Sequence, residues 1–289
     1  MKPAPFEYHA PDTVSDVVAL LAEHGDEIKP LAGGQSLVPM LALRLTRFEH
    51  LVDLNRVDEL EGIRRDKGTL TVGATTRQAT IERSELAQAV PLLARAAPLI
   101  GHFQIRNRGT VGGSLAHADP AAELPAVALA LDAQMEIATG AGRHAVPAAD
   151  FFVGTWTTSL EPNELLTAVQ FPVWDGRCGF VVDEVARRAG DFALAGVTTA
   201  LQLDPGGTVQ RAAIALFGMA STPVRAPAAE TALIGSQPDP AALREAAQLA
   251  VRDLDPPEDV HASSTYRRSV GAHLVERSLT RALDEANHA

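Results

Sequence analysis

The chain has 289 residues, enough for two or three subdomains. Its formal net charge is −11 and its basic residues form no long stripe, which argues against nucleic-acid binding. It contains no apolar run of the ~18 residues that cross a bilayer, and its opening residues MKPAPFEYHAPD lack the apolar core of a signal peptide. We therefore expect a cytoplasmic protein without a membrane span.

The first fifty-five residues predict alternating strands and helices. A short strand at FEYHA precedes a helix over VSDVVALLAEH, which Asp12 or Thr13 begins and Gly25 ends. A strand at IKPL, a short helix after Ser36 and a strand in HLVDLNRV follow. This βαβαβ order favours a small parallel sheet.

The rest of the chain is mixed and changes character near Cys178. TLTVGATT and MEIAT predict strands, PLLARAAPLI and AELPAVALALDA predict helices, and HFQIRNRGTVGGSLAHADP predicts a loop. GFVVDEVARR, AGVTTALQLD and VQRAAIALFGM then predict strands, with a turn at residues 205–207. The alanine-rich chain after Pro223 predicts helices. We expect a C-terminal domain of antiparallel strands plus helices.

Cys178 is the single cysteine, and it limits the redox chemistry of the chain. One thiol forms no internal disulfide and does not supply the several thiolates of an iron–sulfur cluster. Redox chemistry would therefore need an organic cofactor or a partner chain. Because free cysteines are commonly buried, we interpret Cys178 as a small apolar residue within a strand.

Several common catalytic motifs are missing. The sequence has no GxGxxG, GxxxxGK[ST], HExxH, CxxC or GxSxG, so Rossmann, P-loop, metalloprotease and serine-hydrolase functions have no support. His117 and Asp119 could touch a metal ion. Two such residues in a loop are weak evidence, and a polar turn or a loop facing a substrate is the favoured interpretation.

Two glycine-rich segments carry the signal for a cofactor. In LAGGQSLVP, Gly33 and Gly34 separate a predicted strand from a predicted helix, where backbone N–H groups favour a phosphate. In RGTVGGSLAHADP, further glycines lie among the hydroxyl groups of Thr110 and Ser114. One such segment is more often an ordinary turn, whereas two are consistent with a pyrophosphate held from both sides by N–H and O–H donors.

A resemblance to a known family extends over essentially the whole chain. AGGQSL, QIRNRGTVGGSLAHADPAAELP, EVARRAGDFALAGV and the opening KPAPFEYHAPDTVSDVVALL are similar to the FAD-binding medium subunit of the xanthine dehydrogenase and carbon monoxide dehydrogenase family, the molybdenum hydroxylases. The resemblance implies an α+β, vanillyl-alcohol-oxidase-like fold, in which two subdomains hold FAD and a C-terminal domain follows. We expect these parts at residues 1–55, 56–177 and 178–289.

The resemblance also implies which residues contact the cofactor. Both glycine-rich segments would line the diphosphate of FAD, through Ala32, Gly33, Gly34, Gln35, Ser36, Leu37, Thr110, Val111, Gly112, Gly113 and Ser114. His117 and Asp119 would lie along the ribityl chain or the flavin edge. No catalytic acid–base residue is expected.

Two positions depart from the family pattern. Glu123 stands where an aspartate commonly binds the sugar chain. Phe192 follows Gly190-Asp191, where several relatives have a tyrosine beside the flavin, so Phe192 either stacks on the ring or packs in the core.

Two pairs of arginines also have alternative interpretations. Arg106 and Arg108 flank the second segment and could steady a phosphate or the adenine, because guanidinium groups suit phosphate geometry. For Arg187 and Arg188 a solvated face is favoured over a partner contact.

The resemblance finally implies a division of labour among three chains. A molybdenum-cofactor large subunit would hydroxylate the substrate, and a small subunit with [2Fe–2S] clusters would relay the electrons. This chain would pass them from FAD to oxygen, NAD or a quinone, within a dimer of heterotrimers. The alternative is a stand-alone FAD-dependent oxidoreductase that acts directly on a small molecule, and a third possibility is a module that binds nucleotides without redox chemistry.

Overall fold

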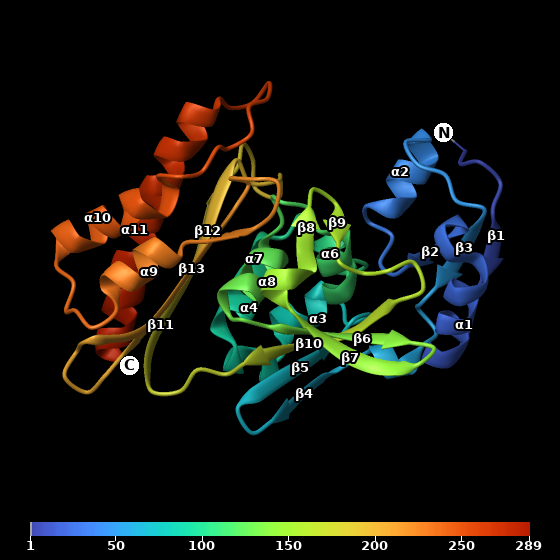
Figure 1. Ribbon diagram of the computed structural model, residues 1–289, viewed down its shortest axis with the longest axis horizontal. Helices are drawn as coiled ribbons and strands as arrows, with labels where there is room; N and C mark the ends of the chain where they lie inside the picture. Colours follow the sequence, from blue (N-terminus) through green and yellow to red (C-terminus); the bar gives the residue numbers. More distant parts are fainter. Residues whose placement is uncertain (1) are drawn as a thin grey trace.

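The computed structural model describes residues 2–289, and its N-terminal part is a small parallel sheet with helices (Figure 1). The elements are β1 (Glu7–His9), α1 (Val14–His24), η1 (Gly25–Glu27), β2 (Ile28–Leu31), α2 (Leu37–Leu43) and β3 (His50–Asp53). The strand order is β1-β3-β2, and both pairings are parallel. Thr13 begins α1 by accepting a hydrogen bond from Asp16 N at 3.1 Å, and the helix ends at Gly25. The predicted parallel sheet is therefore confirmed.

A five-stranded antiparallel sheet, in the order β4-β5-β10-β6-β7, organises the middle of the chain. Its strands are β4 (Ile63–Asp66), β5 (Thr69–Gly73), β6 (Gln134–Thr139), β7 (Gly142–Pro147) and β10 (Leu165–Pro172). The other elements are η2 (Asp58–Leu60), α3 (Gln78–Arg83), η3 (Leu86–Ala89), α4 (Pro91–Ala96), η4 (Ala97–Leu99), α5 (Phe103–Arg106), α6 (Val111–His117), α7 (Glu123–Ala130), α8 (Ala148–Phe151) and the hairpin β8 (Phe152–Gly154) and β9 (Thr157–Thr158).

The loop predicted between the two helices of this region is wrong, because α5 and α6 occupy most of it. Thr110 caps α6 by accepting a hydrogen bond from Gly113 N at 3.0 Å. Val111 and Leu115 are fully buried in the core. Burial of these two side chains and the cap stabilise a helix that its glycines would disfavour.

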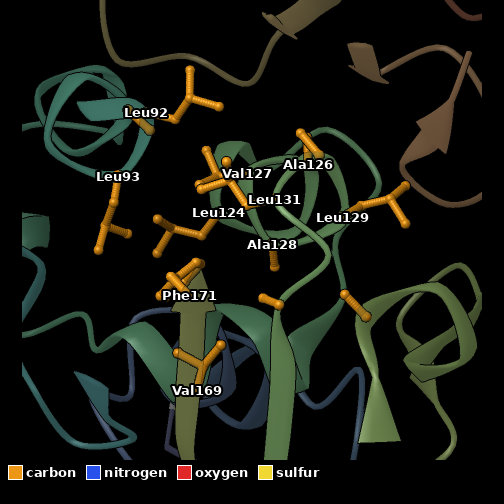
Figure 2. Packing of buried hydrophobic residues seen from close by; sticks show 14 of the residues in the cluster. Leu92, Leu93, Leu124, Ala126, Val127, Ala128, Leu129, Leu131, Val169 and Phe171 are labelled. Carbon is orange, nitrogen blue, oxygen red and sulfur yellow. The ribbon is translucent and has the colours of Figure 1, made fainter. Parts of the chain in front are cut away.

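Helix α7 forms the centre of the molecule. All eight of its residues are buried, and an apolar surface on every side is typical of a core helix. Figure 2 shows its leucine, valine and alanine side chains between Leu92 and Leu93 of α4 and Val169 and Phe171 of β10. Its other side reaches the C-terminal sheet, where Thr198 Oγ1 donates to Ala126 O at 3.4 Å.

The C-terminal part is a four-stranded antiparallel sheet covered by three helices, as the sequence predicts (Figure 1). Its elements are β11 (Arg177–Val185), β12 (Ala195–Leu203), β13 (Val209–Phe217), β14 (Val224–Arg225), α9 (Pro227–Leu233), α10 (Pro240–Val251) and α11 (Ser264–His288). Helix α11 packs on β11 and β12, and α4 and α7 also contact the strands. Cys178 lies buried in β11, as expected, and burial raises the pKa of its thiol to about 11. Among residues 2–289, no helix is long and apolar enough to cross a bilayer.

Candidate functional site

The first glycine segment, residues 32–37, connects the end of β2 to the start of α2. Gly34 has φ +73°, a conformation that other residues rarely adopt. The five consecutive backbone N–H groups from Gly33 to Leu37 find no acceptor among residues 2–289. Such a row of free donors is suited to an anionic ligand.

The second glycine segment, residues 110–114, forms the cap and first turn of α6, and its backbone N–H groups from Val111 to Ser114 already have acceptors. Val111 N donates to Thr76 O at 2.9 Å, and Gly112 N donates to Ala74 O at 2.8 Å. Gly113 N and Ser114 N both donate to Thr110, to its side chain at 3.0 Å and to its carbonyl at 3.1 Å. The expectation of free N–H groups is therefore wrong for Val111 to Ser114, and the hydroxyl groups of Thr110 and Ser114 remain as groups that the segment can offer to a ligand.

The two glycine segments lie side by side. A Cβ on Gly33 would stand 2.3 Å from Arg108 O, and a Cβ on Gly113 would stand 3.4 Å from that of Ala32. A Cβ on Gly112 would meet the Cβ of Ala74 at 2.4 Å. Gly33 and Gly112 thus make room for neighbouring protein.

A polar network at the ends of β2 and β3 holds the segments together, and sequence reasoning missed it. Asn55 Nδ2 donates to Ala32 O at 3.1 Å, while Arg77 donates to Asn55 Oδ1 and, at 2.5 Å, to Arg108 O. Burial alone would raise the pKa of Asp53, but hydrogen bonds from Tyr8 and Asn55 outweigh it and lower that pKa. The position of Asp53 and Asn55 at the carboxyl end of a parallel strand was the available signal, since ligands gather there.

Arg106 is a structural residue, which corrects its assignment to a phosphate or the adenine. Its side chain is mostly buried and pairs with Glu82 at 2.9 Å. It also donates to Ile100 O at 3.1 Å and to Gly101 O at 3.0 Å. Arg108, in contrast, is exposed next to Gly33.

His117 and Asp119 follow α6 and meet the tip of the β8–β9 hairpin. Trp156 Nε1 donates to Asp119 Oδ2 at 3.1 Å, and the Trp156 ring stacks over His117 with centroids 6.4 Å apart. Ala121 N donates to the other carboxylate oxygen of Asp119 at 2.9 Å, so this carboxylate is used within the chain. Burial lowers the pKa of His117, Asp119 opposes that shift and Lys29 adds to it. Trp156 was not predicted, because no local pattern links it to His117.

Glu123 begins α7 and is buried. Burial raises its pKa to about 8, and the charges of Glu184 and Asp119 add to the shift. Burial likewise raises the pKa of Glu184 to about 7, with Asp183 contributing. Glu184, on β11, is thus near enough to Glu123 for its charge to influence the pKa of Glu123.

Phe192 is exposed over 65% of its surface, so the alternative of core packing is wrong. Gly190, two residues earlier, packs against the residue before α5, since a Cβ there would lie 2.8 Å from the ring of His102. Arg187 and Arg188 are exposed, as favoured, and Arg187 pairs with Asp191 at 3.6 Å.

Comparison with known proteins decides the family. Residues 4–174 match the FAD binding domain in molybdopterin dehydrogenase, and residues 181–282 match the CO dehydrogenase flavoprotein C-terminal domain. The chain belongs to this family. It is an FAD-binding subunit of an oxidoreductase, as its resemblance implied.

Similar proteins cover nearly its whole length. The 6-hydroxypseudooxynicotine dehydrogenase complex subunit alpha of Paenarthrobacter nicotinovorans is 44% identical over 99% of this chain and 97% of its own. The carbon monoxide dehydrogenase medium chain of Hydrogenophaga pseudoflava is 39% identical over 98% of each. A structure of the carbon monoxide dehydrogenase from that organism, lacking the Mo-pyranopterin moiety, matches 99% of both chains with a TM-score of 0.96 and 41% identity. The expected α+β fold, an FAD-binding domain followed by a C-terminal antiparallel sheet with helices, is confirmed.

Proposed function

We propose that this chain is the electron-transferring medium subunit of a three-chain molybdenum hydroxylase. It would receive electrons from a [2Fe–2S] small subunit, which a molybdenum-cofactor large subunit reduces, and pass them to oxygen, NAD or a quinone. The row of five free N–H groups beside the second glycine segment carries the FAD-binding part of the proposal, and similarity to a carbon monoxide dehydrogenase medium chain supports the subunit role. The bound flavin supplies the redox chemistry, while the chain supplies binding and orientation.

The first glycine segment would hold the diphosphate of FAD through its backbone. Oxygens of a diphosphate accept hydrogen bonds from N–H groups without needing a charged side chain. The hydroxyl groups of Thr110 and Ser114 would approach the same phosphates from the other side, because the two segments are in contact. Asn55 and Arg77 join the two glycine segments, which together we call the cradle. These two residues would keep the cradle in shape before FAD binds.

The remaining predicted residues would meet the sugar chain and the ring. His117 and Asp119 are fixed by Trp156 and would lie along the ribityl chain. Because its pKa is about 8, Glu123 carries a proton at neutral pH and can donate a hydrogen bond as well as accept one. The exposed ring of Phe192 is available to stack on or cover the flavin.

Exposed apolar side chains beside the first glycine segment support a partner chain. Val38, Leu43 and Leu45 on and after α2 are 50%, 55% and 71% exposed, and α2 stands out from the sheet beside the N-terminus (Figure 1). Large apolar side chains grouped in this way are typical of docking surfaces. We propose that partner subunits cover them in a cytoplasmic dimer of heterotrimers. Isolation of the native complex tests this: molybdenum and iron should co-purify, and a lone yellow chain with its own turnover would refute it.

A glycine substitution tests the cradle itself. Gly34→Ala places a Cβ at φ +73°, and Gly235→Ala places one at φ +81° in the C-terminal domain, where nothing lies within 4 Å. Both variants should lose about 1–2 kcal/mol of stability through backbone strain, and Gly34→Ala should lose somewhat more because its Cβ also lies 3.0 Å from Val38 Cγ2. Only Gly34→Ala should also lose FAD affinity, by about tenfold or more, about 1.4 kcal/mol. Fluorescence titration of FAD into the FAD-free chain measures it, and equal affinity in the two variants would refute the cradle.

A further inference from the structure

Three histidines from three separate elements of the N-terminal sheet lie together. His9 ends β1, His24 ends α1 and His50 begins β3. Glu7 pairs in register with His50, and alternation along β1 puts His9 on the same face as Glu7. Helix α1 contacts β2 and β3, so its last residue, His24, reaches the same place.

The ring nitrogens of these histidines have the spacing of metal ligands. One nitrogen from each residue lies within 4.8 Å of the others, and His9 Nε2 is 3.2 Å from His50 Nδ1. Two imidazole nitrogens bound to one zinc ion at ~2.0–2.1 Å lie about 3.3 Å apart when the geometry is tetrahedral. The His24 and His50 rings lie against each other with centroids 3.9 Å apart, and both side chains are half-buried.

We propose that His9, His24 and His50 bind one divalent transition-metal ion of the zinc type. Imidazole is a preferred ligand of such ions, and three imidazoles on a rigid frame leave one coordination position for solvent. Glu7 Oε2 lies 3.6 Å from His50 Nδ1 and adds negative charge beside the ion. Each ligand is half-buried, so the ion has access from solvent.

This metal site is structural and separate from the flavin cradle. His50 is the first residue of β3 and Asp53 is the last, so the ion and the cradle lie at opposite ends of the strand, about 10 Å apart. The ion joins β1, α1 and β3 by bonds that span more than forty residues of sequence. It therefore stabilises the N-terminal sheet, since a ligand that binds only the folded state shifts the unfolding equilibrium.

Zinc titration of the untagged full-length chain, stripped with EDTA and loaded with FAD, tests the site. We expect one Zn²⁺ per chain by elemental analysis and calorimetry, a higher Tm with Zn²⁺, and tetrahedral d–d absorption bands with Co²⁺ in its place. His9→Gln and His24→Gln should each weaken Zn²⁺ binding by about 100-fold or more, because loss of a ligand exceeds the 10–100-fold cost of losing a residue behind one. His273→Gln, on the exposed face of α11, is the matched control and should bind as the parent does.

Two results would overturn the site. The first is a parent chain that binds no Zn²⁺ and gains no stability from it, a measurement that depends on no variant. The second is Zn²⁺ binding by His9→Gln and His24→Gln equal to that of His273→Gln, in protein whose circular dichroism matches the parent.

Discussion

The buried carboxyl group of Glu123 should make the stability of this chain fall with rising pH. Its folded pKa is about 8, against 4.5 for the free side chain, because burial disfavours the charged form. Between these two values the unfolded chain has lost the proton and the folded chain keeps it. The contribution of Glu123 to the free energy of unfolding is therefore fully present below about pH 4.5. It declines by about 1.4 kcal/mol per pH unit as the pH rises towards 8.

Replacing the carboxyl with a neutral amide isolates this effect. Glu123→Gln keeps the side-chain size and cannot ionise, so its stability lacks the decline. The difference in unfolding free energy between Glu123→Gln and the parent should move in favour of the variant by about 3 kcal/mol from pH 5 to pH 7.5. Its absolute value at pH 5 reports how well the amide fits the buried site.

Urea unfolding of the FAD-free chain, followed by circular dichroism from pH 5 to pH 8.5, measures this difference. Glu245→Gln on the exposed side of α10 is the matched control, and its difference from the parent should stay constant across the range. A Glu123→Gln difference that is equally constant would refute the reasoning. It would mean that Glu123 ionises in the folded protein with the same ease as in the unfolded chain.

Two further predictions concern packing around the cradle. Gly112→Ala should lower the unfolding free energy by about 1–3 kcal/mol, because its new Cβ meets the Ala74 backbone and side chain at 2.4–2.8 Å. The control variant Gly140→Ala, where nothing lies within 4 Å, should change that free energy by less than about 0.5 kcal/mol. Chemical denaturation compares the two variants, and equal stability would show that α6 does not need its close contact with Ala74. Arg106→Met should cost about 3 kcal/mol, since it strands the half-buried Glu82 carboxylate and two carbonyls. The FAD affinity of the folded variant should stay within about twofold of that of the parent. A large loss of affinity would instead show that Arg106 contributes to FAD binding.

Local patterns were sufficient for the elements and the family. The alternation of apolar residues and the turn and cap residues predicted the parallel sheet, the antiparallel C-terminal strands and the long terminal helix. Two unusual glycine-rich segments indicated a pyrophosphate, the family resemblance that they carry implied FAD, and the family match agrees. The error at residues 102–120 arose because glycines lower helix propensity, while burial of Val111 and Leu115 outweighs it.

Only the tertiary structure decided which backbone N–H groups are free to bind a ligand. Both glycine segments contain a Gly-Gly pair and a serine, yet the N–H groups of Val111 to Ser114 in the second donate to Ala74, Thr76 and Thr110, and those of the first remain free. Two of these acceptors, the carbonyls of Ala74 and Thr76, come from a part of the chain more than thirty residues away, which a local sequence pattern does not contain. The same holds for the burial of Glu123, for Trp156 against His117, and for the meeting of three histidines, because each depends on contacts between elements far apart in the chain.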